Sequence, residues 1–418
     1  LILVAALSAL VFTACDDKKT ATLEKEERGI ILSNMDTEVS PKQDFYNYVN
    51  GSWMKNTKIP DDKVRWGGCG VLRKSTDKED LGILDQSDKS GKYKAGTDQA
   101  KATAILNTQL DTMACNKAGT TPLQPALDKI AAVKTKDDFV KLMTLNATTV
   151  SQPFIGVAAY PNPSNSAMNA AYLTPGGLGL PDRDYYTNTD AKSVEIRGQY
   201  VDHITRMLQF LGDNEASART QAETILAFET KLAEPRLDKV QSRDFRNFNN
   251  PRAISQVQEM VPSINWETAL KDLGIEKKVD TLIVMQPKYM ERVQNIMKAD
   301  NVATWKTVTR WATFNSATGA LTTEIEKANW DFYSKTLSGA KKQRPADERA
   351  LGIVNGTVGE ALGKLYVDEM FPPKAKEKAE IMIENVIAAY QDRIKNLDWM
   401  SPETKLKAIE KLDKFTVK

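Results

Sequence analysis

The sequence contains one histidine, His203, in 418 residues. Zinc hydrolases with an H-E-x-x-H motif need two histidines one helical turn apart, and Ser-His or Cys-His systems need one beside the nucleophile. The zinc class is therefore excluded for this chain acting alone, and a catalytic role must involve a larger molecule or only carboxylates and lysines. His203 lies beside the apolar stripe of a predicted helix, so we expect a partly buried structural residue.

The chain also has few cysteines and almost no net charge. Three cysteines cannot form a disulfide framework. We expect Cys69 and Cys115 to be reduced and buried, with a disulfide between them as the alternative. The 57 Lys and Arg nearly balance 55 Asp and Glu, so no global field attracts nucleic acid, and no nucleic-acid partner is expected. The composition is that of a soluble globular protein, and the length predicts two or three domains.

No apolar run is long enough to span a bilayer, which takes about 20 residues. The uncharged run of residues 1–14 suits the apolar core of a signal peptide. It ends in Phe12-Thr13-Ala14 before Cys15, which resembles the lipobox of bacterial lipoproteins and implies that Cys15 is lipidated. A generic signal peptide with an incidental cysteine, or a buried helix, is the alternative.

This pattern predicts three parts: a lipoprotein signal peptide with its lipobox at 1–15, a polar flexible tether at 16–40, and a folded body at 41–418. We expect the protein in the bacterial cell envelope, attached to a membrane by a lipid anchor and facing the periplasm or the exterior.

Helical periodicity dominates the body, so the predicted fold class is mainly α with minor short strands. One convincing strand is predicted, at 282–285. The predicted helices span 196–211 with Gly212 as C-cap, 225–232, 251–261 after Asn250 as N-cap, 383–397, and a last helix through 412 capped by Ser401.

The segment 175–186 is dense in glycine and proline and is predicted to be a loop. Its glycines would suit a phosphate cradle, but no preceding strand or Lys-Ser/Thr pair completes a P-loop. Asp182 and Asp184 would suit a glycosidase acid/base pair, but nothing nearby suggests sugar binding.

Several separated strings resemble the amino-terminal region of neprilysin-type zinc metallopeptidases, especially the bacterial oligopeptidase O group. Their order and approximate spacing match from about residue 33 to the end. The strings include Asp44-Phe45-Tyr46, Arg65-Trp66-Gly67, Gly177-Leu178-Gly179-Leu180-Pro181-Asp182-Arg183-Asp184-Tyr185-Tyr186, Phe228-Glu229, Asn265-Trp266, Val354-Asn355 and Gly359-Glu360-Ala361-Leu362-Gly363.

The resemblance implies one helical lobe of a two-lobed peptidase, whose lobes enclose a chamber that limits substrates to oligopeptides. In such enzymes the zinc-binding H-E-x-x-H and a downstream glutamate lie beyond the point that corresponds to Lys418. We therefore expect a fragment with no catalytic residue and no metal ligand of its own, inactive alone, whose zinc and catalytic lobe belong to the complete enzyme. The alternative is a non-catalytic helical surface lipoprotein that binds peptides or glycans.

Arg65 is the candidate substrate-binding residue. Its segment resembles the family's stretch whose arginine reaches into the cleft and pairs with the terminal carboxylate of the peptide. A guanidinium suits that role because its planar fork donates two parallel hydrogen bonds. The family usually has a Phe and then an acidic residue where this chain has Cys69 and Gly70, which alters the support of the arginine. An ordinary surface arginine is the alternative.

Overall fold

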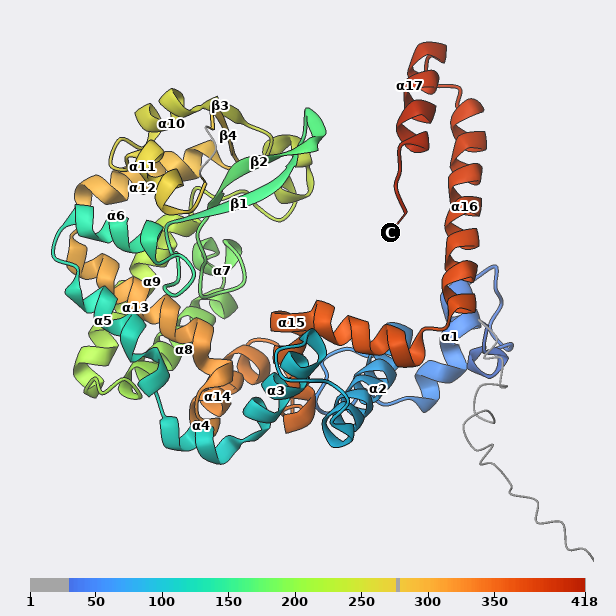
Figure 1. Ribbon diagram of the computed structural model, residues 1–418, viewed down its shortest axis with the longest axis horizontal. Coiled ribbons are helices and arrows are strands. Elements are labelled where there is room, and N and C mark those ends of the chain that lie inside the picture. The colour runs from blue at the N-terminus through green and yellow to red at the C-terminus, as the bar shows by residue number, and fades with distance from the viewer. Residues whose placement is uncertain (1–29, 276–278, 418) are drawn as a thin grey trace, which may run out of the picture. The chain divides into compact units, whose positions relative to one another are not determined.

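The computed structural model describes residues 30–275 and 279–417 (Figure 1). The chain divides into two compact units, Leu1–Arg65 and Trp66–Lys418. Cys15 and the predicted signal peptide lie outside the described residues. Among the described residues, no helix is long and apolar enough to cross a membrane.

The first unit contains a short 3-10 helix, Leu32–Asn34, and α1, Phe45–Asn56. The buried carboxylate of Asp36 accepts a hydrogen bond from Lys55 Nζ at 2.6 Å. The hydroxyl of Ser52 donates to the carbonyl of Met35 at 2.7 Å. Part of the segment predicted as a tether therefore packs on α1.

A four-stranded sheet lies within the larger core of the second unit. Its strands are β1 (Ile155–Asn162), β2 (Asn165–Pro175), β3 (Pro251–Ala253) and β4 (Thr281–Val284), in the order β1-β2-β4-β3. β1 and β2 form an antiparallel hairpin, β2 and β4 are parallel, and β3 pairs antiparallel with β4. β1 is therefore an edge strand.

Helices supply the rest of this core, in which α8 packs against α9 and aromatic rings from α6, α9 and α13 meet around Phe154. The helices of the larger core are α5 (Gln124–Ala132), α6 (Lys136–Leu145), α7 (Asp184–Thr187), α8 (Ala191–Gln209), α9 (Glu215–Ala233), α10 (Ile254–Met260), α11 (Trp266–Asp272), α12 (Pro287–Ala299), α13 (Val302–Ala317) and α14 (Thr323–Trp330).

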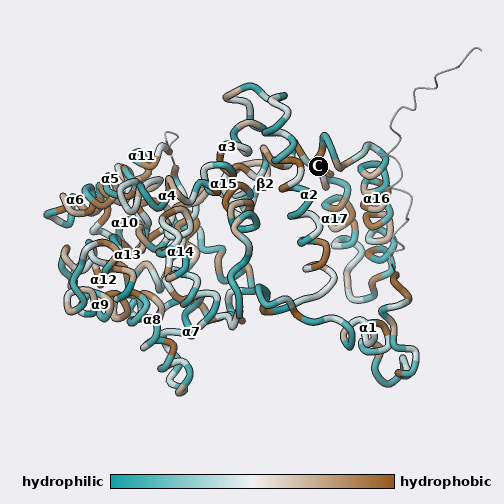
Figure 2. Tube along the Cα trace, turned by 90° about the horizontal axis from the view of Figure 1, so that it is seen from below, coloured by the Kyte–Doolittle hydropathy of each residue, from teal (hydrophilic) through white to brown (hydrophobic). Residues whose placement is uncertain are grey.

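A smaller core forms where α2 (Gly68–Ser90), α3 (Asp98–Leu110) and α15 (Ala346–Met370) pack together. α4 (Thr112–Ala118) follows α3. The hairpin of α16 (Pro373–Lys395) and α17 (Pro402–Asp413) has no buried residue, although hydrophobic residues recur along both helices (Figure 2).

Most predicted helices are confirmed. α8 is followed by Gly212 at φ +88°, and the Ser401 side chain accepts from the Thr404 amide at the start of α17. The predicted helix start at Pro251 is wrong, because Pro251–Ala253 pairs with β4 and α10 begins at Ile254. Proline is tolerated there because β3 is an edge strand, and pairing with β4 outweighs the local signal.

Candidate functional site

Arg65 lies on an exposed segment that leads into α2. Among the described residues, its guanidinium forms no hydrogen bond or ion pair. By contrast, the nearby Arg73 on α2 is paired with Asp77, Nε to Oδ1, at 2.7 Å. All five N–H donors of Arg65 are thus available for a ligand.

Trp66 and Gly70 form a close contact at the first turn of α2. A Cβ atom built on Gly70 would lie 3.0 Å from Cε3 of Trp66, tighter than most real contacts. The ring of Trp66 therefore occupies the space that a side chain at position 70 would need. Cys69 is exposed and Cys115 is half-buried, and both thiols are free. The free thiols agree with the expected reduced state, but the expected burial is wrong for both cysteines.

A buried carboxylate, Glu229 of α9, holds the glycine-rich loop. The hydroxyl of Tyr186 donates to Glu229 Oε2 at 2.7 Å, and the hydroxyl of Tyr200 donates to the same oxygen at 3.0 Å. Tyr186 in turn accepts from the Leu180 amide at 2.8 Å, and Tyr200 accepts from Trp311 Nε1 at 3.1 Å. One carboxylate thus connects the loop to α8, α9 and α13.

Burial sets the protonation of this region. It raises the pKa of Glu229 to about 7, against the lowering effect of the hydrogen bonds from Tyr186 and Tyr200. It lowers the pKa of His203 to about 3, with a further contribution from the charge of Arg206. The imidazole of His203 stacks on Phe332 at 4.7 Å between ring centroids, and its buried Nε2 has no hydrogen-bond partner within the described part of the chain. His203 is therefore a buried structural residue, as predicted.

The Glu229 cluster was missed by sequence reasoning, although the signal was present. Ile225, Phe228 and Leu232 mark the buried face of the helix, and Glu229, four residues after Ile225, falls on the same face. A glutamate at such a position needs partners, and the two tyrosines supply them.

Asp182 and Asp184 lie near one cation, Lys239, whose Nζ is 3.2 Å from an oxygen of the first and 3.4 Å from an oxygen of the second. This shared ion pair fixes the loop to the segment after α9. It accounts for the two carboxylates without an acid/base role.

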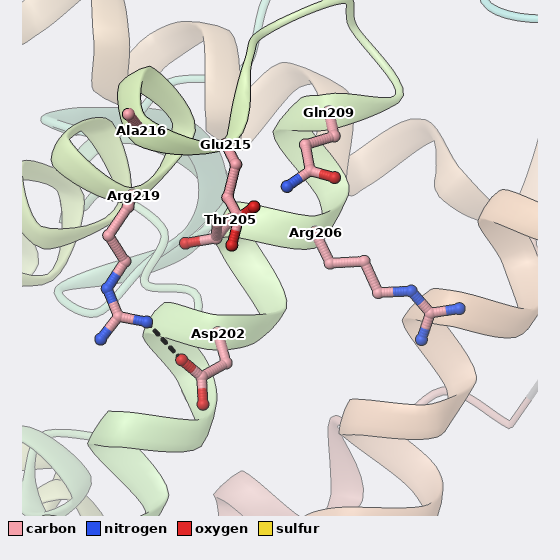
Figure 3. A pocket seen from close by; sticks show the side chains of 7 residues that line it. All are labelled: Asp202, Thr205, Arg206, Gln209, Glu215, Ala216 and Arg219. Carbon is pink, nitrogen blue, oxygen red and sulfur yellow. Dashed lines mark hydrogen bonds and ion pairs between the residues drawn. The ribbon is translucent and has the colours of Figure 1, made fainter.

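A cavity of about 730 Å³ lies between α8 and the start of α9 (Figure 3). Its arginines are already paired. Arg219 pairs with Asp202 across the cavity, as the dashed line shows, and Arg206 Nη1 lies 3.5 Å from Asp331 Oδ2. Both arginines of this cavity are therefore already engaged by carboxylates. The lining residues are Asp202, Thr205, Arg206, Gln209, Glu215, Ala216 and Arg219.

The described residues do not fit a zinc site. Within residues 30–275 and 279–417, no three His, Cys, Asp or Glu side chains gather to hold a metal ion. His203 is enclosed by aromatic rings.

Comparisons with known sequences point in one direction. The profile of peptidase family M13 matches residues 41–418. Neprilysin-3 of Drosophila melanogaster is 27% identical over 405 residues, covering 92% of this chain and 51% of that protein. Endothelin-converting enzyme 1 of Rattus norvegicus is 25% identical over 393 residues, again covering 92% of this chain and 51% of the relative.

Solved structures agree. The zinc metalloprotease Zmp1 of Mycobacterium tuberculosis, in complex with an inhibitor, superposes with a TM-score of 0.84 at 30% identity, covering 93% of this chain and 58% of that one. PepO from Lactobacillus rhamnosis has the same fold, with a TM-score of 0.80 at 20% identity over 90% of this chain and 59% of that one. The chain spans about half the length of the curated relatives it matches.

Proposed function

Because the chain belongs to peptidase family M13, as the amino-terminal region of a neprilysin-type enzyme, we propose that it encloses and orients substrate for a zinc-dependent endopeptidase that hydrolyses oligopeptides. The observation that carries this proposal is the match over residues 41–418, together with the TM-score of 0.84 to a zinc metalloprotease. Enclosure contributes to catalysis by positioning the substrate, not by breaking the bond.

In this proposal the zinc is held by a catalytic part of the complete enzyme that these 418 residues do not include. The test incubates the complete gene product with a fluorogenic oligopeptide, with and without a chelator. We expect the complete gene product to cleave the peptide and the chelator to abolish this cleavage. We expect the 418 residues alone neither to cleave the peptide nor to bind zinc stoichiometrically. Saturable peptide binding by the complete gene product without any cleavage would contradict the proposal and favour a non-catalytic binding protein.

Arg65 is proposed to bind the terminal carboxylate of the peptide. Support comes from its exposure and from its lack of any other partner among the described residues. Position 70 is a glycine, so no carboxylate there competes for the guanidinium.

Replacement of Arg65 with Met in the complete enzyme should lower kcat/KM for peptides with a free carboxylate by about 10- to 100-fold, the value of a charge-assisted hydrogen-bond pair. The C-terminal amides of the same peptides should lose less than about 3-fold. Lys58→Met, which removes an exposed cation from the same segment, is the matched control. Equal losses for acids and amides would remove the carboxylate-binding role.

We also propose that Cys15 carries a lipid that attaches the protein to a membrane of the bacterial envelope. The lipobox-like Phe12-Thr13-Ala14-Cys15 supports this. Cys15→Ser should move the protein from the membrane fraction to the soluble fraction. An unchanged distribution would exclude anchoring through this residue.

A further inference from the structure

The edge strand β1 has unused backbone hydrogen-bonding groups. The Gly176 amide donates to the Phe154 carbonyl at 3.1 Å, so Phe154 and Gly176 form a hydrogen-bonded pair at the start of the hairpin. Because such pairs alternate along antiparallel strands, the N–H and C=O groups of Ile155, Val157 and Ala159 point away from β2. Within the described residues, no other strand pairs with β1.

Most of this edge lacks the usual protection against pairing with another chain. Exposed edges normally carry charged side chains, proline or a bulge, yet Ile155–Tyr160 has no charged side chain and no proline, and Pro161 and a register shift come only at the far end of β1. The strand becomes progressively exposed from Gly156 to Tyr160. An additional strand would therefore find free donors and acceptors and no charge to repel it.

An apolar cavity of about 180 Å³ lies beside the start of β1. Ile155 and Val157 form one wall, Val140 and Met143 of α6 form another, and Trp266 of α11 closes it. An apolar cavity of roughly 150 Å³ accepts a benzene ring, so this one is large enough for one leucine or phenylalanine side chain.

The polar side chains of the cavity wall already have partners. The hydroxyl of Thr144 lies 3.0 Å from Asp272 Oδ2, and Gln152 Nε2 donates to the Val150 carbonyl at 2.9 Å. The cavity therefore selects for an apolar group, whereas the adjacent strand edge requires a polar backbone.

We propose that the edge of β1 and this cavity together bind an extended peptide, which adds a strand beside Ile155–Ala159 and places one apolar side chain in the cavity. Main-chain hydrogen bonds supply affinity and the cavity supplies specificity. A second copy of the chain fits less well, because its own Ile155 is buried and unable to enter the cavity. The choice of a peptide as occupant rests on the proposed function, since a peptidase meets free oligopeptides.

The test measures how tightly the full chain binds a fluorescein-labelled, end-blocked heptapeptide that has a central leucine among threonine and serine residues. The buffer contains a chelator, so that the result does not depend on cleavage. Ala147→Phe fills the cavity from its half-buried wall and should raise Kd at least about 10-fold. Val157→Pro removes an outward N–H and also changes the cavity wall that Val157 forms, so it should likewise raise Kd about 10-fold. Thr148→Phe, an exposed neighbour that does not line the cavity, should leave Kd within about 2-fold.

A peptide with a central glycine, or with N-methylated backbone amides, should bind at least about 10-fold more weakly than the parent peptide. Unchanged binding by Ala147→Phe and Val157→Pro, or equal binding of the N-methylated peptide, would overturn the proposal. So would a dimer of the parent chain that Val157→Pro converts to monomer in sedimentation, because a second copy would then occupy the edge. Peptide binding at this site without any zinc-dependent cleavage by the complete gene product would contradict the proposed function but still support the β1 binding site.

Discussion

Gly179→Ala is expected to lower the free energy of unfolding by about 3 kcal/mol or more, a large loss for one methyl group. A Cβ at this position would lie 1.7 Å from the hydroxyl oxygen of Tyr200 and 2.7 Å from its Cζ. Tyr200 is fully buried and has little room to move, because its hydroxyl bonds both Glu229 and Trp311 and its ring packs against Phe332. The loop itself must therefore shift and lose its contacts with Glu229.

Gly177→Ala is the matched control in the same loop. No heavy atom lies within 4 Å of a Cβ built there, and its backbone is outside the region that favours glycine. We expect a change within about 0.5 kcal/mol. Urea unfolding measures both variants, and similar midpoints for Gly179→Ala and Gly177→Ala would show that the close approach of the loop to Tyr200 is not rigid.

A double-mutant cycle identifies the source of the strain. Tyr200→Phe removes the hydroxyl that a Cβ at Gly179 would meet first, so the loss caused by Gly179→Ala should shrink by about 1 kcal/mol or more in that background. An additive result would place the strain elsewhere in the loop.

The sequence predicted the fold class because the helices carry their own signal. The profile and the solved structures confirm a mainly helical lobe of the neprilysin type. α8 has an apolar stripe that buries Tyr200, Ile204 and Leu208, and a glycine at positive φ follows its end. Such a stripe is visible in the sequence without knowledge of what it packs against.

The sheet was predicted only in part. β4 is a short apolar run, and its prediction at 282–285 is confirmed within one residue. The β1–β2 hairpin was missed because alanine fills many positions in both strands and the far end is exposed on both faces, so no alternation of apolar and polar residues marks it. Pairing with β4, which is distant in sequence, determines β3.

The candidate site was predicted where residue type and order are informative. The exposed Arg65 follows from a recognisable segment, and its role stays a prediction. The glycine-rich loop was recognised as a loop, but the reason for its glycines lies in distant residues. Gly176 and Gly179 approach the backbone of Pro153 and the hydroxyl of Tyr200, contacts that only the folded chain reveals.

Glu229→Gln and His203→Phe are expected to change the pH dependence of stability in opposite directions. The pKa of Glu229 is about 7 in the folded chain against 4.5 in the unfolded chain, so the folded chain binds more protons between these values. Its contribution to stability is present below pH 4.5 and is lost as the pH rises through 7.

His203 has the opposite sign. Its pKa is about 3 in the folded chain against 6.5 in the unfolded chain, so its contribution is present above pH 6.5 and is lost as the pH falls through 3. Between pH 4.5 and 6.5 the changes in stability with pH that come from Glu229 and from His203 are therefore equal and opposite in the parent chain.

Removing either group leaves the pH dependence of the other one visible. From pH 6.5 to 4.5, Glu229→Gln should lose about 3 kcal/mol of stability through His203, whereas His203→Phe should gain about 3 kcal/mol through Glu229. Glu229→Gln preserves shape, and His203→Phe replaces the buried Nε2, which has no hydrogen-bond partner among the described residues, with an apolar ring atom. Groups common to both variants contribute equally, so the difference between the two pH profiles isolates this pair. Urea unfolding at pH 4.5, 5.5 and 6.5 measures it, and parallel profiles would mean that neither group keeps its shifted pKa in the folded chain.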